Sequence, residues 1–412
     1  MVCLLLSAYG VGVFASRTMA LACERHLAFL AIGGQDRPDF RTISDCRTRH
    51  GEACSDVCVA VGRLAGEAGR VTWGHVSTDG TKIHGHASRH QAMRSGEMQQ
   101  AVERWREDLA VLVPQASQQD EAEEAALGSR RGDALPAELA RREDRLATME
   151  AARRRWEARA KADAATERQR RAEAEAERQR TGQTRRGQGP KPVADAPADQ
   201  APSHVTDPAL PIMPTTNKGW ESCGNAHVRV DAPCQIIVAG DVTEASHDTQ
   251  QAEPVAPATL ATVAQAGLAL PKDESGVAQA LPATLDQGDD SETAVQALED
   301  GGCDPSIATG RQRPHGSEAE ASAPPTPAQE RRAAQGRTPD GKALYARRQV
   351  IGEPVCGQSK EARGCRRFLL RGLQKIRGAW RLVCLGQNLL KLWRSGGAQS
   401  AASTMEKRPL GC

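Results

Sequence analysis

Carboxylate side chains are the residues of this sequence that could perform chemistry on phosphate esters. Asp and Glu supply the hard oxygen ligands that Mg²⁺ prefers. Two such ions roughly 4 Å apart can activate a nucleophile and stabilise the leaving oxygen in phosphoryl transfer. The chain has 52 acidic residues among its 412. Spacing alone therefore selects none of them, and the local sequence around each acid has to decide.

Three acids stand in distinctive local sequences. Asp79 lies in Val-Ser-Thr-Asp-Gly-Thr-Lys, and Asp286 lies in Thr-Leu-Asp-Gln-Gly-Asp-Asp-Ser-Glu, directly after a short apolar segment. Glu353 is followed, after six intervening residues, by Lys360. By spacing alone, Asp79 is more simply interpreted as the aspartate of an Asp-Gly turn. A catalytic interpretation therefore depends on the three segments taken together.

Together these segments resemble the motifs of bacterial insertion-sequence DDE transposases, which have a ribonuclease H-like catalytic core. The first is similar to the first-strand motif of that family, and the second to its Asp-x-Gly-Tyr-Tyr/Phe-Ser-Glu segment. The third, preceded by Tyr345-Ala-Arg-Arg348, is similar to the Tyr-Arg-Glu-Lys signature, although Arg348 lies one residue further from the Glu than is usual. Segments 37–41, 363–372 and 387–392 also resemble the family, so the resemblance spans residues 1–395.

The resemblance implies a role for each matching residue. Asp79, Asp286 and Glu353 would be catalytic and would hold two Mg²⁺ ions, with Mn²⁺ as a substitute. The residues expected to contact DNA or phosphate near the cut are Tyr345, Arg348 and Lys360. The implied reaction is hydrolysis at the ends of a mobile element, followed by attack of the freed 3′-hydroxyl on target DNA. The implied partners are the terminal inverted repeats, target DNA and further copies of the chain, in the bacterial cytoplasm at the nucleoid.

The sequence departs from the family pattern where that pattern has aromatic side chains. Asp289 and Asp290 stand where two aromatics are usual, and Cys356 and Cys365 stand where Phe is usual. The chain also begins inside the family's N-terminal domain, which suggests a truncated and decayed copy or errors in the sequence. Each lost buried Phe costs about 3–5 kcal/mol, and a whole domain is stable by only about 5–15 kcal/mol. We therefore expect an inactive or poorly folded product.

The elements that must position these residues begin with a helical N-terminal region at residues 1–66. The apolar run from Val2 to Phe14 predicts a buried first helix. Ser16 can cap a second helix, a turn is expected at Gly33-Gly34, and Pro38 can open a third helix. Three short helices are typical of a helix-turn-helix DNA-binding module, although a plain helical bundle fits the pattern equally well.

The catalytic core is expected to begin at residues 70–88, with a strand, a turn at Asp79-Gly80 and a second strand. Residues 91–181 predict two amphipathic helices around a loop, which could fold as an antiparallel coiled-coil hairpin. Residues 182–206 are rich in Gly, Pro and Ala, and they predict a flexible linker.

Residues 207–395 supply the rest of the predicted core. Strands are expected at 228–230 and 235–239, and a short apolar segment at 281–285 ends at Asp286. The remaining expectations are a helical stretch at 254–266, a loop at 311–341, a basic helical region at 342–395 and a disordered tail at 396–412. Strands and helices in this order predict an α/β fold, and the resemblance implies a ribonuclease H-like mixed sheet with a helical insertion.

Composition narrows the function classes. Aromatic residues are only 3% of the chain, which predicts a thin core. The net charge of +2 provides no global attraction for nucleic acid, so any such attraction must come from local patches. The 12 Cys include no CxxC pair, so neither a zinc site nor a disulfide framework is indicated. The first apolar run is too short to cross a bilayer, so no membrane partner is expected.

Other function classes fit part of the sequence. A non-catalytic DNA-binding or coiled-coil interaction protein explains the helical regions but not the three motifs. A related DDE-type nuclease would share the cleavage chemistry. A metal-binding protein would use His75, His84, His86 and His90, but no Cys or carboxylate pattern completes such a site. The expected function is therefore that of a transposase, with the activity of this copy left open.

Overall fold

The computed structural model describes two compact units of the chain. One unit comprises Met1–His86, Met213–Gly219 and Cys223–Cys412, and the other Ala87–Ile212 and Trp220–Ser222. The described residues are 1–51, 54–72, 74–87, 92–110, 134–181, 192–196, 202–204, 207, 209–215, 219–245, 280–285, 292–300, 302–307, 334, 336 and 338–406. The predicted helix at 254–266, Asp286 and most of the predicted loop at 311–341 lie outside them.

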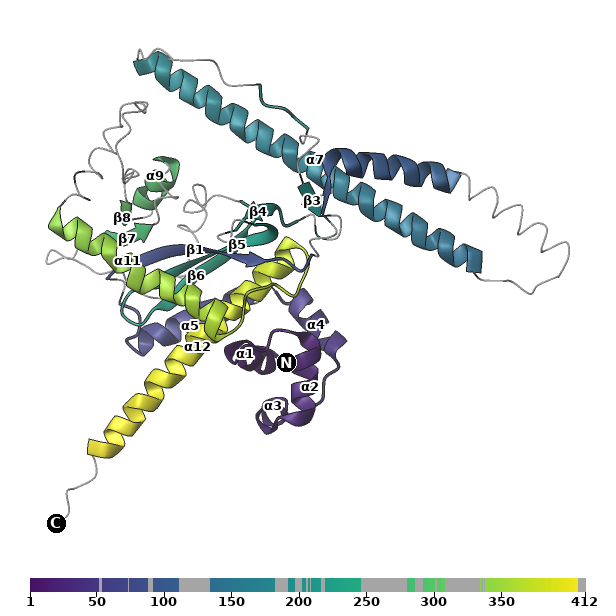
Figure 1. Ribbon diagram of the computed structural model, residues 1–412. Coiled ribbons are helices and arrows are strands. Elements are labelled where there is room, and N and C mark those ends of the chain that lie inside the picture. The colour runs from purple at the N-terminus through teal and green to yellow at the C-terminus, as the bar shows by residue number, and fades with distance from the viewer. Residues whose placement is uncertain are drawn as a thin grey trace. The chain divides into compact units, whose positions relative to one another are not determined.

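A mixed sheet forms the centre of the first unit (Figure 1). Its order is β4-β5-β1-β7-β8, and β6 pairs with β5. β1 runs antiparallel to β5 and parallel to β7, while β7 and β8 are parallel to each other. The strands are β1 (Val76–His84), β4 (Ile212–Pro214), β5 (Trp220–Asp231), β6 (Ile236–Thr243), β7 (Leu281–Leu285) and β8 (Cys303–Ile307). The predicted strands at 228–230 and 235–239 are confirmed, and the short apolar segment at 281–285 forms β7.

The predicted turn at Asp79-Gly80 is wrong. β1 continues through both residues, and its register with β5 pairs Asp79 with Val228 and Gly80 with His227. The partner strand is long enough to hydrogen-bond to the whole of β1. Satisfying those backbone groups in one ladder outweighs the local preference of Asp-Gly for a turn. Asp79 therefore lies inside a central strand.

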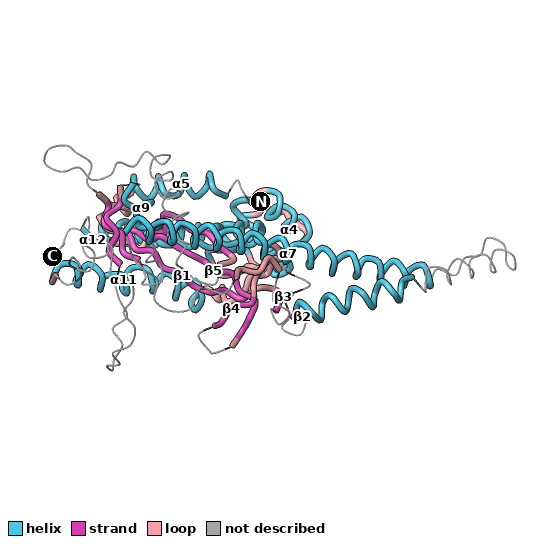
Figure 2. Tube along the Cα trace, turned by 90° about the horizontal axis from the view of Figure 1, so that it is seen from above, coloured by secondary structure: helices cyan, strands magenta, loops and turns pink. Residues whose placement is uncertain are grey.

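The two faces of the sheet carry different side chains of β1. Val76 belongs to an apolar core cluster with Ala65 of α5 (Cys54–Glu67) and with Val295 and Leu298 of α9 (Glu292–Asp300). Because side chains alternate along a strand, Ser77 and Asp79 face the opposite side. That side is covered by α11 (Pro339–Gly357). Figure 2 shows the strands running between α5 and α11.

The C-terminal part of the chain contains two long helices, α11 and α12 (Leu373–Glu406). The Thr338 side chain caps α11 by accepting a hydrogen bond from Gly341 N. After α11 come the π-helix η4 (Gln358–Ala362) and α12, which packs on β6. The Asn388 amide pairs with both backbone groups of Ile237, at 2.8 and 2.7 Å. α12 continues to Glu406, so residues 396–406 are helical where a disordered tail was expected.

The N-terminal region is helical, as predicted, but it contains more and shorter helices than the three expected from the sequence. Its helices are α1 (Val2–Gly10), α2 (Ser16–Arg25), α3 (Leu27–Ile32), α4 (Phe40–Arg49) and α5. α1 is buried against α12, where Gly10 and Gly386 allow close backbone approach. Ser16 is not the cap of α2, because Ala15 holds that position and the Ser16 hydroxyl accepts a hydrogen bond from Arg47 instead. Asp39 caps α4.

The second unit contains the helical insertion. Residues 95–110 form a helix that packs against α7 (Ala134–Thr181) through Val102, Trp105 and Met149. An ion pair of 2.7 Å between Arg106 and Glu150 joins the same two helices. A short sheet pairs β2 (Ala92–Arg94) with β3 (Pro202–His204), which lies in the segment expected to be a flexible linker. Among the described residues of either unit, every helix is too short or too polar to cross a bilayer.

Candidate active site on the face of strand β1

Asp79 lies where β1 and α11 come closest together. A Cβ atom built on Gly352 of α11 would lie 2.9 Å from Asp79 Cβ and 3.1 Å from Ser77 Oγ. Neither distance leaves room for a side chain. Glycine at position 352 therefore allows the helix backbone to approach the strand at the one point where the strand presents a carboxylate.

Arg348 connects Asp79 with Glu353. Its Nη1 lies 3.9 Å from Asp79 Oδ1, and its Nη2 lies 3.1 Å from Glu353 Oε1. The side chains of Arg348 and Asp79 are only 13% and 12% exposed, whereas that of Glu353 is 48% exposed. The structure therefore brings two of the three predicted catalytic acids together around one guanidinium, with Asp79 inside the protein and Glu353 towards solvent.

The electrostatic environment of Asp79 has several contributions. Burial raises the pKa of the Asp79 carboxyl, and the nearby Glu353 carboxylate acts in the same direction. A hydrogen bond with the Cys356 side chain and the charge of Arg348 both lower that pKa, but the net shift is upward. A neutral Asp79 is thus easier to form than in water, and a further cation at this position would favour its ionised form.

Cys356 is the nearest neighbour of Asp79 on the next turn of α11. Burial raises the pKa of its thiol well above the ordinary value, and the Asp79 charge adds to that shift. The neutral thiol therefore acts as a hydrogen-bond partner of the carboxylate rather than as a nucleophile. The sequence pattern has Phe at this position in the resembled family, so the Cys replaces packing with a polar contact.

The predicted DNA-contacting residues surround the same cluster. The Arg348 guanidinium lies over the Tyr345 ring, 5.8 Å from its centroid. Lys360 lies in η4, and its charge lowers the pKa values of the Cys356 and Cys365 thiols, so its ammonium group is close to both. π-helical segments often occur at functional sites. Arg348 is engaged with the two carboxylates, which the sequence did not predict.

Asp286 lies outside the described residues. In the chain it directly follows Leu285, the last residue of β7, and β7 runs parallel to β1 with Ser77 paired to Thr284. On the same side of the sheet, His75 Nε2 lies 3.1 Å from Thr284 Oγ1. Burial and the charge of Arg347 lower the pKa of His75 to about 4, so this imidazole is neutral at pH 7.

The donor atoms at this site fit a divalent metal ion in kind. Asp79 and Glu353 supply hard carboxylate oxygens, which suit Mg²⁺ or Mn²⁺, and their shared Arg348 shows that a cation is already stabilised between them. Within the described part of the chain, no group of three or more His, Cys, Asp or Glu side chains is arranged to hold a metal. The alternative histidine site is therefore not formed by the described His75, His84 and His86, and His90 lies outside the described residues.

Three residues of the site were missed by the motif comparison. Ser77 and Gly352 form the close contact between β1 and α11, and Cys356 binds Asp79. A glycine in the middle of a predicted helix, next to Glu353, was a usable signal because glycine weakens a helix unless close packing requires it. The hydrogen bond of Cys356 could not have been read from the sequence.

Comparison with known families connects this geometry with a known class of enzyme. Residues 308–393 match the family model of the transposase DDE domain. Over these residues the chain is similar to DDE transposases. Searches among curated proteins and among solved structures gave no match. The transposase segment includes α11, η4 and the first part of α12, and so contains Arg348, Glu353 and Lys360.

Asp79 lies outside the matched segment but is in contact with it. α11 brings Glu353 and Arg348 of the segment to Asp79 on β1. Transposases of this class act on DNA and use divalent metal ions. Cluster and family match therefore point to the same face of the sheet.

Proposed function

We propose that this chain is a DNA transposase that cleaves the ends of a mobile element and joins them to target DNA. The observation that carries the proposal is the cluster of Asp79, Arg348 and Glu353, because it joins a central strand to the segment that matches the transposase DDE domain. The proposed catalytic residues are Asp79, Asp286 and Glu353.

A ribonuclease H-like core is part of the proposal. The strand order β6-β5-β1-β7-β8, with β5 antiparallel and β7 parallel to β1, supports it. Adjacent parallel strands end at the same edge of a sheet, so a residue directly after β7 is well placed to join Asp79. The helix at 95–110 and α7 would be the helical insertion, folded as a coiled-coil hairpin.

Asp79, Asp286 and Glu353 would hold two Mg²⁺ ions, which supply activation of the attacking oxygen and stabilisation of the leaving oxygen when bound. The protein's own groups position the DNA. The planar fork of Arg348 can grip two phosphate oxygens, and stacking on Tyr345 orients it. Lys360 offers a point charge for a phosphate. Burial of Asp79 keeps bulk water away from one side of the reacting phosphate.

The proposed reaction has two in-line transfers. Water attacks a phosphodiester at the element end, breaks the P–O3′ bond and leaves a free 3′-hydroxyl and a 5′-phosphate. That hydroxyl then attacks a phosphodiester of target DNA, and the target strand leaves through its own 3′-oxygen. The first step loses one phosphodiester bond to hydrolysis, and the second conserves the number of phosphodiester bonds. Neither step needs an organic cofactor. Assembly of several copies on paired element ends in the bacterial cytoplasm completes the proposal.

A strand-cleavage assay tests the proposal. The substrate is a duplex that carries the inverted repeat flanking the gene, with Mg²⁺ or Mn²⁺ present. We expect cleavage by the full chain, a loss of about 10³-fold or more in Asp79→Asn and in Glu353→Gln, and little change in Glu361→Gln, an exposed acid of η4 paired with Arg366. Full activity of Asp79→Asn would refute the catalytic assignment.

A non-catalytic DNA-binding protein is the second candidate. The observation in its favour is that Arg348 already lies between the Asp79 and Glu353 carboxylates and compensates part of their charge. This candidate predicts that the full chain binds the same duplex, and that no metal ion, at any concentration, produces a cut strand. The cleavage assay separates the two candidates directly.

A further inference from the structure

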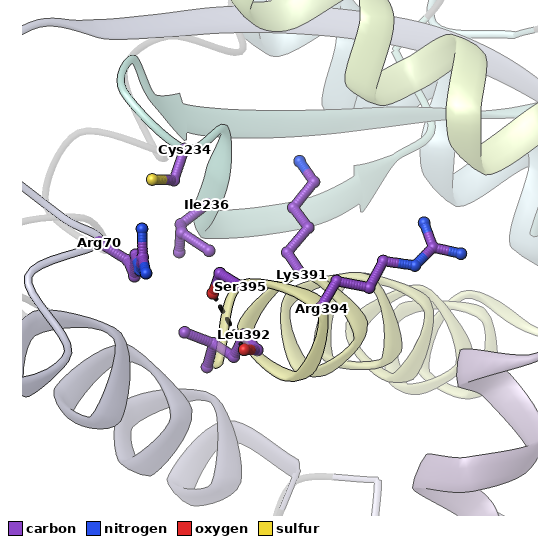
Figure 3. A pocket seen from close by; sticks show the side chains of 7 residues that line it. All are labelled: Arg70, Cys234, Ile236, Lys391, Leu392, Arg394 and Ser395. Atoms are coloured by element: carbon purple, nitrogen blue, oxygen red, sulfur yellow. Dashed lines mark hydrogen bonds between the residues drawn. The ribbon is translucent and has the colours of Figure 1, made fainter. Parts of the chain in front are cut away.

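A pocket of about 350 Å³ lies away from the carboxylate cluster, between the middle of α12, the β5–β6 hairpin and Arg70, which follows α5 in the chain (Figure 3). Three of its lining side chains are basic, and none is acidic. Its lining is formed by Arg70, Cys234, Ile236, Lys391, Leu392, Arg394 and Ser395. The proposed catalytic reaction uses none of these residues.

Two basic side chains of this pocket, here called the cationic pocket, each repel a further basic residue, Arg363. The charge of Arg363 lowers the pKa of Lys391, after the larger effect of burial, and brings that pKa to about 8. The charge of Arg394 in turn lowers the pKa of Arg363. Like charges held together destabilise the folded chain unless a counter-charge is present.

The described part of the chain does not provide that counter-charge. Neither Arg70 nor Arg394 forms an ion pair with any residue that the structure describes. Lys391 Nζ donates to the Gln235 carbonyl at 2.5 Å, which is a neutral acceptor, and the ammonium group has two further donors. The charges are therefore available to an anion from outside.

The arrangement of the side chains indicates the kind of anion. In Figure 3, Arg70 lies across the pocket from α12, the Lys391 amine points towards the β5–β6 hairpin, and the Arg394 guanidinium points away from Arg70. The three groups surround the apolar side chains of Ile236 and Leu392 rather than converge on one point. Such a spread suits successive phosphates of a chain better than one phosphate ion, and the apolar floor suits a sugar.

We propose that the cationic pocket is a second DNA contact, in which Arg70, Lys391 and Arg394 bind backbone phosphates independently of base sequence. It lies outside the carboxylate cluster and positions DNA without taking part in the reaction. This inference rests on the proposed function for its ligand, since phosphodiester DNA is that function's substrate.

The test is DNA binding by the full chain as a function of salt. Labelled duplexes of two unrelated sequences are titrated at several salt concentrations with the wild type and with Arg70→Gln/Arg394→Gln. Each lost phosphate contact lowers the slope of log K against log salt by about 1, so the double variant should lose about 2 units of slope on both duplexes. Arg394→Gln alone, at an exposed position, should lose about 1.

The matched control neutralises two exposed basic residues at the start of the same helix, Arg371 just before α12 and Lys375 in its first turn. Arg371→Gln/Lys375→Gln has the same change in net charge, and both residues lie outside the pocket. We expect its salt slope to equal that of the wild type. Equal slopes for the two double variants would overturn the proposal, because the effect would then follow net charge and not the pocket.

A free-phosphate arm identifies the source of the anion. If the site takes free phosphate, millimolar inorganic phosphate will raise the melting temperature of the wild type and not that of Arg70→Gln/Arg394→Gln. In that case the wild type and the double variant will also have the same salt slope for DNA binding. That outcome overturns the assignment to DNA.

Circular dichroism checks that the variants fold. Cleavage by the wild type and by Asp79→Asn is measured in parallel. If the wild type binds DNA through the pocket but never cleaves it, the catalytic proposal alone is refuted. A wild type that does not bind DNA refutes both.

Discussion

At β1, the guanidinium of Arg348 lies between two carboxylates, whereas at β6 the cationic pocket gathers basic side chains with no acid among them. The first cluster holds one cation against two carboxylates, so its charge is only partly compensated, and its inner carboxylate is buried. The second is more open and carries uncompensated charge. Both are built on the same sheet and are lined by the C-terminal helices, α11 in one case and α12 in the other.

The difference indicates what each region requires from outside. A cluster of two carboxylates with one guanidinium retains negative charge, which suits a site where a metal ion enters and DNA follows. A cluster of like charge is relieved only by an anion. The comparison therefore assigns chemistry to the carboxylate site and binding to the pocket, and the following changes test that division.

The largest effect on stability is expected at Trp380, which anchors α12 to the sheet. Its side chain is fully buried and its Nε1 donates to the His227 carbonyl at 3.2 Å. Trp380→Ala should lower the free energy of unfolding by about 3–5 kcal/mol, as measured by urea denaturation. Trp393→Ala, on the same helix but 74% exposed, should change it by no more than about 0.5 kcal/mol. Equal losses would show that α12 is not held at Trp380.

A smaller loss in the free energy of unfolding is expected when the cation beside Asp79 is removed. Arg348→Gln leaves the buried Asp79 carboxylate without its cation, and should destabilise the protein by about 3 kcal/mol, the lower end for a broken buried pair. Mg²⁺ should restore part of that stability, because a metal can replace the guanidinium. Arg394→Gln in the pocket should change stability by no more than about 0.5 kcal/mol. Similar losses in both variants would remove the distinction between the two regions.

A substitution that displaces the Asp79 side chain but keeps its charge should lower the metal affinity of the carboxylate site. Gly352→Ala places a Cβ 2.9 Å from Asp79 Cβ, so the carboxylate must shift. We expect the affinity for the metal ion to fall by about 10–100-fold, as for other changes in the residues that orient a metal-ligating side chain. Gly357→Ala, where no atom lies within 4 Å of the added Cβ, should leave metal binding unchanged. Calorimetric titration with Mn²⁺ measures both.

The smallest effect is a pH dependence at the pocket. The pKa of Lys391 is lowered from 10.5 to about 8 in the folded state, mainly by burial. Below pH 8 both states are protonated and the folded state carries the cost of the buried charge. Between pH 8 and 10.5 only the unfolded state binds the proton, so folding becomes more favourable as pH rises. The stability of the wild type should therefore rise relative to Lys391→Met across this window, and parallel curves would contradict the assignment.

The sequence predicted the parts of the fold that have a strong apolar pattern. The strands at 228–230 and 235–239, the first buried helix and the helical C-terminal region all appear in the structure, and the apolar segment at 281–285 is a strand there. β1 was divided in error because Asp79-Gly80 has a strong local turn preference, and the long partner strand that overrides it is distant in the chain.

The candidate site was predicted in part. Motif comparison brought forward Asp79 and Glu353, which the structure places around one guanidinium. It could not show that Arg348 is that guanidinium, since an ion pair depends on how α11 lies on β1. The cationic pocket was beyond prediction for the same reason, because Arg70 and Lys391 are far apart in sequence and meet only through the packing of α12 on β6.

The most direct test of the account is the binding of Mn²⁺ to the wild type and to Asp79→Asn, Glu353→Gln and Glu361→Gln, followed by electron paramagnetic resonance in the absence of DNA. If Asp79 and Glu353 form one metal site, each of their variants should weaken Mn²⁺ binding by at least about tenfold, while Glu361→Gln binds like the wild type. Equal Mn²⁺ binding by all four proteins would contradict the claim that this carboxylate cluster is the catalytic centre.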